Sequence, residues 1–248
     1  MDRIVSFRCT RSGRQAPAGE LRLETALECM PLFRDLDPGD LATLAATVRT
    51  RRYRRGDVVF QQGDPGDGLY VILSGRVKIW TTGDGGGEAI LATLRANEFF
   101  GALALLDGAP RSASATAIEA TETLTVPRER FRQLIDDEPA IRDHVIVQLA
   151  HEVRRLTTHV EELHFLDIAG RLAARLVRLA EEQGEPASGA EIRLDGPLTQ
   201  GELAAMVGST RQSVNKLLGW LVDDGLIRLD RDAIVILDLP GLRRAARR

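Results

Sequence analysis

Two short helical segments separated by a glycine turn constrain the fold of this chain more than any other feature. The segment LTQGELAAMVGSTRQSVNKLLGWLVDDGLIRL starts its first helix at Thr199, and Glu202 follows at the spacing of a capping box. Apolar residues recur at helical spacing on both sides of Gly208, where a turn is favoured. Ser209 or Thr210 is placed to cap the second helix. We predict helices at 199–207 and 210–222, joined as a helix-turn-helix.

The predicted outward face of the second helix carries side chains suited to reading DNA. Arg211 and Lys216 can donate to guanine in the major groove. Gln212 and Asn215 can pair with adenine. Nearby hydroxyl residues can position the phosphates, namely Thr199, Ser209, Thr210 and Ser213. The alternative is a pair of core helices with a solvated polar face. The cap, the glycine turn, the basic face and a β hairpin predicted at 226–237 favour DNA binding.

Residues 53–125 follow a different pattern, in which short β-rich runs alternate with glycine turns. The strand candidates are 58–60, 69–73, 76–81 and 89–94. Many short strands at this spacing favour a small sandwich or barrel. The strand pattern alone leaves open whether this region is only a scaffold. Helices are expected before it, at 21–30 and 37–48.

A long helix is predicted from Pro139 to about Phe165. Its apolar residues are spaced 3, 4, 3, 4 and 3 residues apart, which is a coiled-coil seam. They are Ile146, Leu149, Val153, Leu156, Val160 and Leu163. Such a seam favours pairing with the same helix of a second subunit, so we predict a homodimer through residues 139–165. The alternative is that the helix only covers the β-rich region. A further helix is expected at 168–182 and a loop at 183–197.

Length and composition favour an ordinary globular chain with more than one domain. The chain has 248 residues, 44% of them hydrophobic, and a net charge of -3, which excludes a globally basic coat protein for nucleic acid. We find no signal peptide and no membrane-spanning stretch, and so expect a cytoplasmic protein without a membrane partner. Two cysteines, Cys9 and Cys29, are too few for an iron–sulfur cluster and fit a reduced chain.

No pattern indicates catalysis or a metal site. All four histidines lie in the predicted long helix, at His144, His151, His159 and His164. Their spacing differs from the i, i+4 pair of a helical zinc site, so polar positions beside the seam are the simpler interpretation. No nucleophile and base are suitably placed either. We therefore predict no metal and no enzyme activity.

Four segments, in order, resemble the CRP/FNR family of bacterial transcription regulators. They are GDPGDGLYVILSGRVKI, FFGALALLDGAPRSASATA, HFLDIAGRL and LTQGELAAMVGSTRQSVNKLL. The resemblance implies an α+β chain with a jelly-roll-like, double-stranded β-helix domain that binds cyclic nucleotides, a dimerisation helix and a winged helix-turn-helix. We place these at residues 23–137, 138–167 and 168–248, after a disordered tail at 1–22. It also suggests RNA polymerase as a partner of the loop at 183–197.

The family's phosphate-binding cassette resembles residues 100–115 here. Gly101 and Leu103 match the start of the cassette, and Arg111-Ser112 matches the end, where it implies contacts with a cyclic phosphate. Ala102 stands where relatives that bind cyclic AMP carry the glutamate that accepts from the ribose 2′-hydroxyl. Loss of such a hydrogen bond costs on the order of 1.5–3 kcal/mol. That corresponds to about ten- to a hundredfold weaker binding.

Two further departures from the family concern base contacts. Relatives contact the ligand's base from a Thr-Ser pair on the dimer helix, and the matching residues here are Leu156 and Thr157. In the reading helix, the family's Arg-Glu-x-x-x-Arg becomes Arg211, Gln212 and Lys216. We therefore expect a palindromic DNA site with an altered half-site.

The resulting hypothesis is a homodimeric, sequence-specific DNA-binding regulator. Its effector would be cyclic AMP, another cyclic nucleotide or another anion in the β-rich domain. One alternative is a ligand-independent regulator with a relic effector pocket. Another is a cyclic-nucleotide-responsive module that acts on a protein partner instead of DNA.

Overall fold

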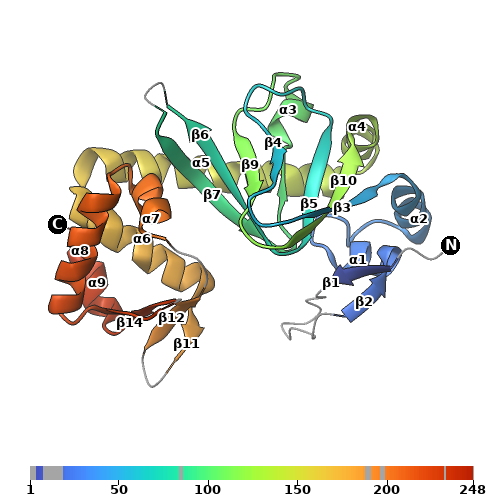
Figure 1. Ribbon diagram of the computed structural model, residues 1–248. Coiled ribbons are helices and arrows are strands. Elements are labelled where there is room, and N and C mark those ends of the chain that lie inside the picture. The colour runs from blue at the N-terminus through green and yellow to red at the C-terminus, as the bar shows by residue number, and fades with distance from the viewer. Residues whose placement is uncertain are drawn as a thin grey trace. The chain divides into compact units, whose positions relative to one another are not determined.

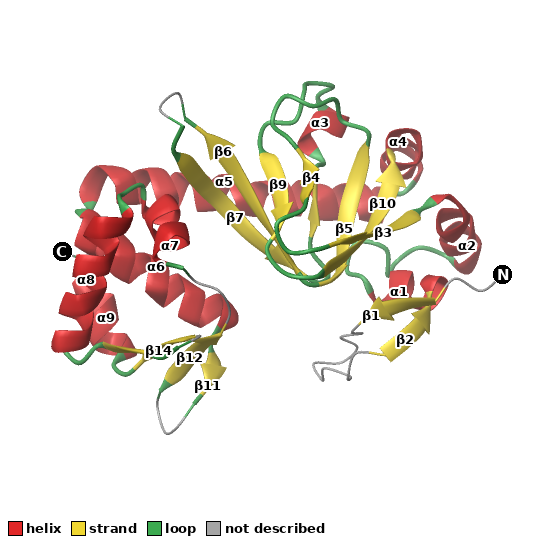
Figure 2. Ribbon diagram, viewed as in Figure 1, coloured by secondary structure: helices red, strands yellow, loops and turns green. Residues whose placement is uncertain are grey.

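The chain forms two compact units. The computed structural model describes residues 4–7, 19–83, 86–187, 191–195, 199–231 and 233–247 (Figure 1). One unit contains residues 1–81 and 91–151, and the other contains residues 82–90 and 152–248. Figure 2 distinguishes the strand-rich and helix-rich parts by colour.

Two four-stranded sheets make up the β-rich region. One has the order β3-β10-β5-β8 and the other β4-β9-β6-β7. The strands are β3 (Arg49–Tyr53), β4 (Val58–Phe60), β5 (Gly68–Ser74), β6 (Arg76–Thr82), β7 (Glu88–Arg95), β8 (Phe99–Phe100), β9 (Ser114–Ala117) and β10 (Thr121–Pro127). The four strands predicted from the glycine-punctuated pattern are confirmed as β4 to β7. The remaining four are short or lack a turn signal that marks their ends.

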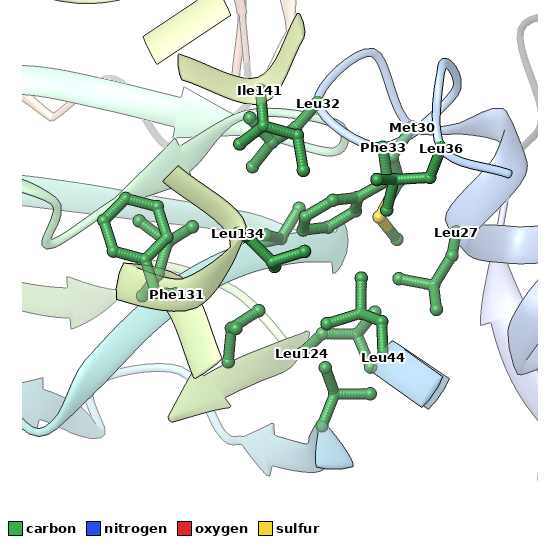
Figure 3. Close-up of a cluster of buried hydrophobic side chains, with 14 of the residues drawn as sticks. Leu27, Met30, Leu32, Phe33, Leu36, Leu44, Leu124, Phe131, Leu134 and Ile141 are labelled. Atoms are coloured by element: carbon green, nitrogen blue, oxygen red, sulfur yellow. The ribbon is translucent and has the colours of Figure 1, made fainter. Parts of the chain in front are cut away.

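One face of the β3-β10-β5-β8 sheet is covered by three helices and the start of a fourth. The three are α1 (Leu23–Cys29), α2 (Pro38–Thr47) and α4 (Arg128–Asp137), and the fourth is α5 (Pro139–Phe165). Figure 3 shows the apolar core between them, which contains Leu44, Phe131 and Leu134 of the helices and Leu124 of β10. Asp37 caps α2 through a 2.8 Å hydrogen bond from the Asp40 N–H, at the start of the helix that the sequence predicted at 37–48.

Alternate side chains of β5 face opposite sides of the sheet and belong to two different apolar cores. Leu69, Val71 and Leu73 of β5 point to the helix-covered core, whereas Tyr70 and Ile72 point to a second core inside the β-rich region. This inner core also contains Val77, Phe100 and Ala115. It lies beside the cassette, so β5 connects the helical layer with the candidate ligand site.

The second unit combines helices with a small sheet. It contains the part of α5 from residue 152 on and the helices α6 (Ile168–Gln183), α7 (Gln200–Val207), α8 (Arg211–Asp223) and α9 (Leu239–Ala245). The sheet has the order β11-β12-β14-β13, formed by β11 (Glu185–Pro186), β12 (Ile192–Asp195), β13 (Ile227–Leu229) and β14 (Ala233–Ile236). The predicted wing hairpin is confirmed as β13 and β14, but it belongs to a larger sheet. The predicted loop at 183–197 is wrong for β11 and β12, because β14 provides β12 with a distant hydrogen-bonding partner.

The N-terminal region differs from the predicted disordered tail in two places. Strands β1 (Ile4–Phe7) and β2 (Gly19–Arg22) pair antiparallel, with Ile4 opposite Arg22. Residues 1–3 and 8–18 lie outside the described residues. Pairing across a long connection carries no local signal, which explains why the sequence did not indicate it.

Cys29 is disulfide-bonded, which corrects the expectation of a reduced chain. The chain has only one other cysteine, Cys9, and it lies outside the described residues. Cysteine pairing depends on a short Cα–Cα distance, which sequence spacing does not supply.

Candidate ligand-binding and DNA-binding sites

The helix-turn-helix is built by local capping around one glycine. Thr199 caps α7 in a full capping box, with its hydroxyl accepting from the Glu202 N–H at 3.1 Å and Glu202 accepting from the Thr199 N–H at 2.8 Å. Gly208 ends α7 in the left-handed conformation, with φ 65°. Thr210, rather than Ser209, caps α8 by accepting from the Ser213 N–H. The predicted helices and both caps are therefore confirmed.

The side chains proposed to read DNA lie on the exposed face of α8. Arg211, Gln212, Asn215 and Lys216 are all exposed, whereas Val214, Leu218 and Leu221 are buried against the domain. Among the described residues, neither Arg211 nor Lys216 has an ion-pair partner, so both charges face solvent. The arrangement offers two cations and two amides together on one helical face, as base-edge recognition requires.

Gln200 is a residue of this surface that the sequence did not single out. Its Nε2 donates to Oδ1 of Asn215 at 2.7 Å, which joins the start of α7 to the middle of α8. This bond uses one of the two acceptor positions of the Asn215 oxygen and leaves the Asn215 amide nitrogen available to donate to a base. The residues are fifteen positions apart, and only the packing of α7 against α8 brings them together.

The hydroxyl residues differ in what they can still offer a phosphate. The Thr199 hydroxyl already has two partners, because it accepts from the Glu202 N–H and also donates to the Glu202 carboxylate at 2.9 Å. Thr210 and Ser213 share one hydrogen bond between their hydroxyls, at 2.9 Å. Ser209 is half-buried in the turn. A phosphate role for these residues stays a prediction. Thr199 is the least suited to it, because its hydroxyl already donates to one partner and accepts from another.

Helix α5 carries a row of apolar side chains without cover in the single chain. Of the six predicted seam residues, five are exposed, from Leu156 at 39% to Val153 at 62%. Leu149 instead packs against the helix-covered core, next to the buried residues Ile141 and Val145. A row of exposed valine and leucine side chains is typical of a surface that binds a partner. We call Ile146, Val153, Leu156, Val160 and Leu163 the seam.

The cassette is assembled around the buried side chain of Arg111. Its side chain is only 1% exposed, and its guanidinium lies 4.2 Å from the centre of the Phe60 ring. Nη1 donates to the Gly101 carbonyl at 2.6 Å, while Nη2 donates to the Gly68 carbonyl and to Oδ1 of Asp67, both at 2.8 Å. Asp67 was not singled out from the sequence, where it belongs to the turn GDPGDG.

Aromatic rings from three strands pack beneath the guanidinium. Tyr70 of β5 stacks on Phe100 of β8 at 5.2 Å, and Phe60 of β4 lies within 5.7 Å of both. Tyr70 donates a 3.2 Å hydrogen bond to Asp67. Burial, together with the charge of Asp67, raises the pKa of Tyr70 to about 12. The phenol therefore stays protonated and acts only as a donor to Asp67.

The other cassette residues occupy different environments. Gly101 has φ +86°, and a Cβ there would lie 2.5 Å from Nη1 of Arg111, so glycine is required on both grounds. Ser112 is exposed. Leu103 begins α3 (Leu103–Leu106) and is 48% exposed. Ala102 is 6% exposed and belongs to the helix-covered core, so its side chain packs among apolar groups.

Thr157, the predicted base contact, lies in the other compact unit. It is exposed, and its hydroxyl donates to the Val153 carbonyl of its own helix at 3.0 Å. The structure therefore joins Gly101 and Arg111 through a direct hydrogen bond and places Ala102, Leu103 and Ser112 on the same short segment.

None of the helices in the described part of the chain is long and apolar enough to cross a membrane. Among the described residues, no three His, Cys, Asp or Glu side chains come together as metal ligands would.

Comparison with known proteins identifies both halves of the chain. Residues 50–138 match the cyclic nucleotide-binding domain, and residues 170–245 match the Crp-like helix-turn-helix domain. The chain is 36% identical over 216 residues to the CRP-like cAMP-activated global transcriptional regulator of Mycobacterium tuberculosis, covering 87% of this chain and 96% of that protein. It is 34% identical to the cyclic AMP receptor protein of Thermus thermophilus, with the same coverage.

Solved structures agree with these matches. The c-di-GMP responsive global regulator CLP of Xanthomonas campestris superposes with a TM-score of 0.71 at 28% identity, covering 82% of this chain and 100% of that one. A fold that joins a cyclic nucleotide-binding domain to a DNA-binding helix-turn-helix defines a transcription regulator rather than an enzyme. This chain belongs to the CRP/FNR family of transcription regulators and binds DNA through its helix-turn-helix.

Proposed function

We propose that the protein is a cytoplasmic homodimer that binds a palindromic DNA site and regulates transcription in response to a small anion. The exposed cations of α8, which have no ion-pair partner among the described residues, carry the DNA part of the proposal. Arg211, Gln212, Asn215 and Lys216 read base edges, and Thr210, Ser213 and Ser209 orient the helix on the phosphates. RNA polymerase is the expected protein partner, through the region that contains β11 and β12.

The seam of α5 supports the dimer. Its five exposed apolar side chains recur at coiled-coil spacing, and burying them requires a partner with the same periodicity. A second copy of α5 meets that requirement and gives the two-fold symmetry that a palindrome needs. Each copy of α8 would then enter one of two successive major grooves, about 34–36 Å apart.

The cassette supports an anionic effector. Arg111 supplies a positive charge in a buried setting, and Ser112 adds a hydroxyl beside it. The relatives named above respond to cyclic AMP and to cyclic di-GMP. Ala102 offers no acceptor for a ribose hydroxyl, so a cyclic nucleotide would be held mainly through its phosphate here. Gly101 and Leu103 shape the backbone around that phosphate, and Thr157 is the proposed base contact.

A ligand-independent regulator is the second candidate. One observation favours it: Arg111 already has three acceptors from the protein itself, at Gly101, Gly68 and Asp67. An arginine satisfied in this way can serve purely to hold the cassette together. Calorimetry with cyclic AMP, cyclic GMP and cyclic di-GMP separates the two candidates, because the relic pocket binds none of them.

Selection of binding sites from random duplex DNA tests the DNA part directly. We expect the full-length protein to enrich a palindrome whose half-sites lie one helical turn apart. Enrichment of a single, non-repeated site would contradict the dimer. Failure to enrich any sequence would favour a module that acts on a protein partner.

A further inference from the structure

Arg111 carries an internal counter-ion that the cassette pattern does not include. Oδ1 of Asp67 lies 2.8 Å from Nη2 of Arg111, in an ion pair between a side chain that is 1% exposed and one that is 57% exposed. Asp67 comes from the turn that precedes β5, forty-four residues before Arg111. The carboxylate therefore approaches the buried guanidinium from the solvent side, from which a dissolved anion would also arrive.

The guanidinium is not fully satisfied by these contacts. A guanidinium has five N–H donors, and Arg111 uses Nη1 and Nη2 for Gly101, Gly68 and Asp67. Its Nε is buried and has no hydrogen-bond partner in the structure. A buried, unpaired donor of a charged group is costly, so this edge of Arg111 is suited to an additional acceptor.

Asp67 is held in position by contacts on both sides. The Tyr70 hydroxyl donates to both carboxylate oxygens of Asp67, at 3.2 and 3.3 Å. The backbone carbonyl of Asp67 accepts from the Arg128 N–H at 3.1 Å. The preceding Gly66 packs so closely on α3 that a Cβ would lie 2.9 Å from the Ala104 Cβ. The carboxylate is thus fixed against the cassette rather than drifting in solvent.

We propose that Asp67 is a built-in competitor of the effector: its carboxylate neutralises Arg111 in the empty pocket and sets how strongly an anion must bind to replace it. This inference rests on the anionic effector of the proposed function. The phosphate of a cyclic nucleotide would take Nε and the donor on Nη2 that Asp67 now occupies, which is the paired geometry that guanidinium and phosphate prefer. Asp67, displaced but still close, would repel the bound anion.

The proposal predicts that removal of one negative charge strengthens anion binding. In Asp67→Asn, the amide oxygen can still accept from Arg111 and Tyr70, so the local structure is retained while the charge is lost. A unit charge several ångströms from a bound anion changes its affinity by about tenfold or more at the dielectric of a protein surface. A residue that merely positions Arg111 would have the opposite effect, because its loss would weaken binding.

Calorimetric titration of full-length protein with cyclic AMP and cyclic GMP tests the proposal. Asp67→Asn should bind at least one of them about tenfold more tightly than the wild type. Asp64→Asn is the matched control, because Asp64 lies in the same turn and its carboxylate accepts from the Gln61 N–H at 2.8 Å. Asp64 contacts Arg111 only through the backbone, where its carbonyl accepts from the Arg111 N–H, and this bond is kept in the variant. Adenosine, which lacks the phosphate, should bind all three proteins alike. Asp67→Ala repeats the measurement if the asparagine variant fails to fold.

Several outcomes would overturn the proposal. They are equal or weaker nucleotide binding by Asp67→Asn, an equal gain in Asp64→Asn, or no binding by either the wild type or Asp67→Asn. Binding by Asp67→Asn alone would support it. Gel-shift titration of the same proteins keeps the two questions apart: intact DNA binding without any nucleotide binding rejects this inference and the effector, while the DNA-binding function stands.

Discussion

Nε2 of Gln200 and Oδ1 of Asn215 are joined by a 2.7 Å hydrogen bond that spans the two helices of the DNA-binding motif. The bond fixes which end of the Asn215 amide faces outward. It therefore couples Gln200 of α7 to the side-chain orientation of Asn215, which we propose contacts a base.

Gln200→Ala is expected to weaken recognition at the base pair that Asn215 reads. Loss of the bond frees the Asn215 amide to rotate, at a cost of about 1 kcal/mol for one hydrogen bond. Fluorescence anisotropy with the selected palindrome and with single-base variants measures the effect. Thr199 should be left unchanged in this experiment, since its capping box supports α7 independently. Equal discrimination by the variant and the wild type would contradict this role for Gln200.

Arg211→Ala should lower the affinity for the selected palindrome and relax its sequence preference. A side chain that contacts a base contributes about 1–3 kcal/mol of discrimination. Arg243→Ala is a suitable control, because Arg243 pairs with Glu181 at 2.7 Å on an exposed surface near the C-terminus. Gel shifts with specific and random duplexes separate lost specificity from lost charge. A loss that is uniform across sequences would assign Arg211 to the phosphates instead.

Val153→Glu should convert the dimer into monomers. Val153 is the most exposed residue of the seam, so the glutamate leaves the folded chain intact but places two like charges in the proposed dimer contact. Sedimentation should show a monomer, and binding to the palindrome should fall with it. His151→Glu, at an exposed position on the other side of α5, should remain dimeric. A dimeric Val153→Glu protein would exclude the seam as the interface.

Ala102→Glu should destabilise the protein instead of creating a cyclic AMP site. Ala102 lies in the helix-covered core, where a carboxyl group finds no partner. An unsatisfied buried polar group costs about 1–3 kcal/mol, and overpacking adds a similar amount. Urea unfolding of Ala102→Glu and of the exposed control Ala109→Glu measures the difference. A stable variant with tighter cyclic AMP binding would show that the side chain turns toward the ligand site.

His144 should make the protein less stable in acid. Burial, assisted by Arg34, lowers its pKa below 6.5, and Asp35 opposes this only in part. As the pH falls below about 6.5, the unfolded chain binds a proton at His144 before the folded chain does, so unfolding becomes easier. His144→Gln should lose less stability than the wild type between about pH 7 and about pH 5, measured by urea midpoints. An unchanged pH dependence would rule His144 out, and His151→Gln is the exposed control.

The sequence predicted those parts of the fold whose signals are local. The capping box at Thr199, the turn at Gly208 and the bounds of α5 and α8 all follow from residues within a few positions of each other. It did not predict β1, β2, β11 and β12, because a strand that pairs with a distant segment has no pattern among its neighbouring residues that shows the pairing. The disulfide at Cys29 was missed for the same reason.

The candidate ligand site shows the same division. The order of motifs along the chain was enough to propose Arg111 as the anion-binding group of a CRP/FNR regulator. Only the tertiary structure brought Asp67 within 2.8 Å of it and Gln200 within 2.7 Å of Asn215. Helix caps and heptad spacing act between neighbours in the chain, so the sequence determines them. Ion pairs and buried environments depend on which distant segments pack together, and that is decided by the fold.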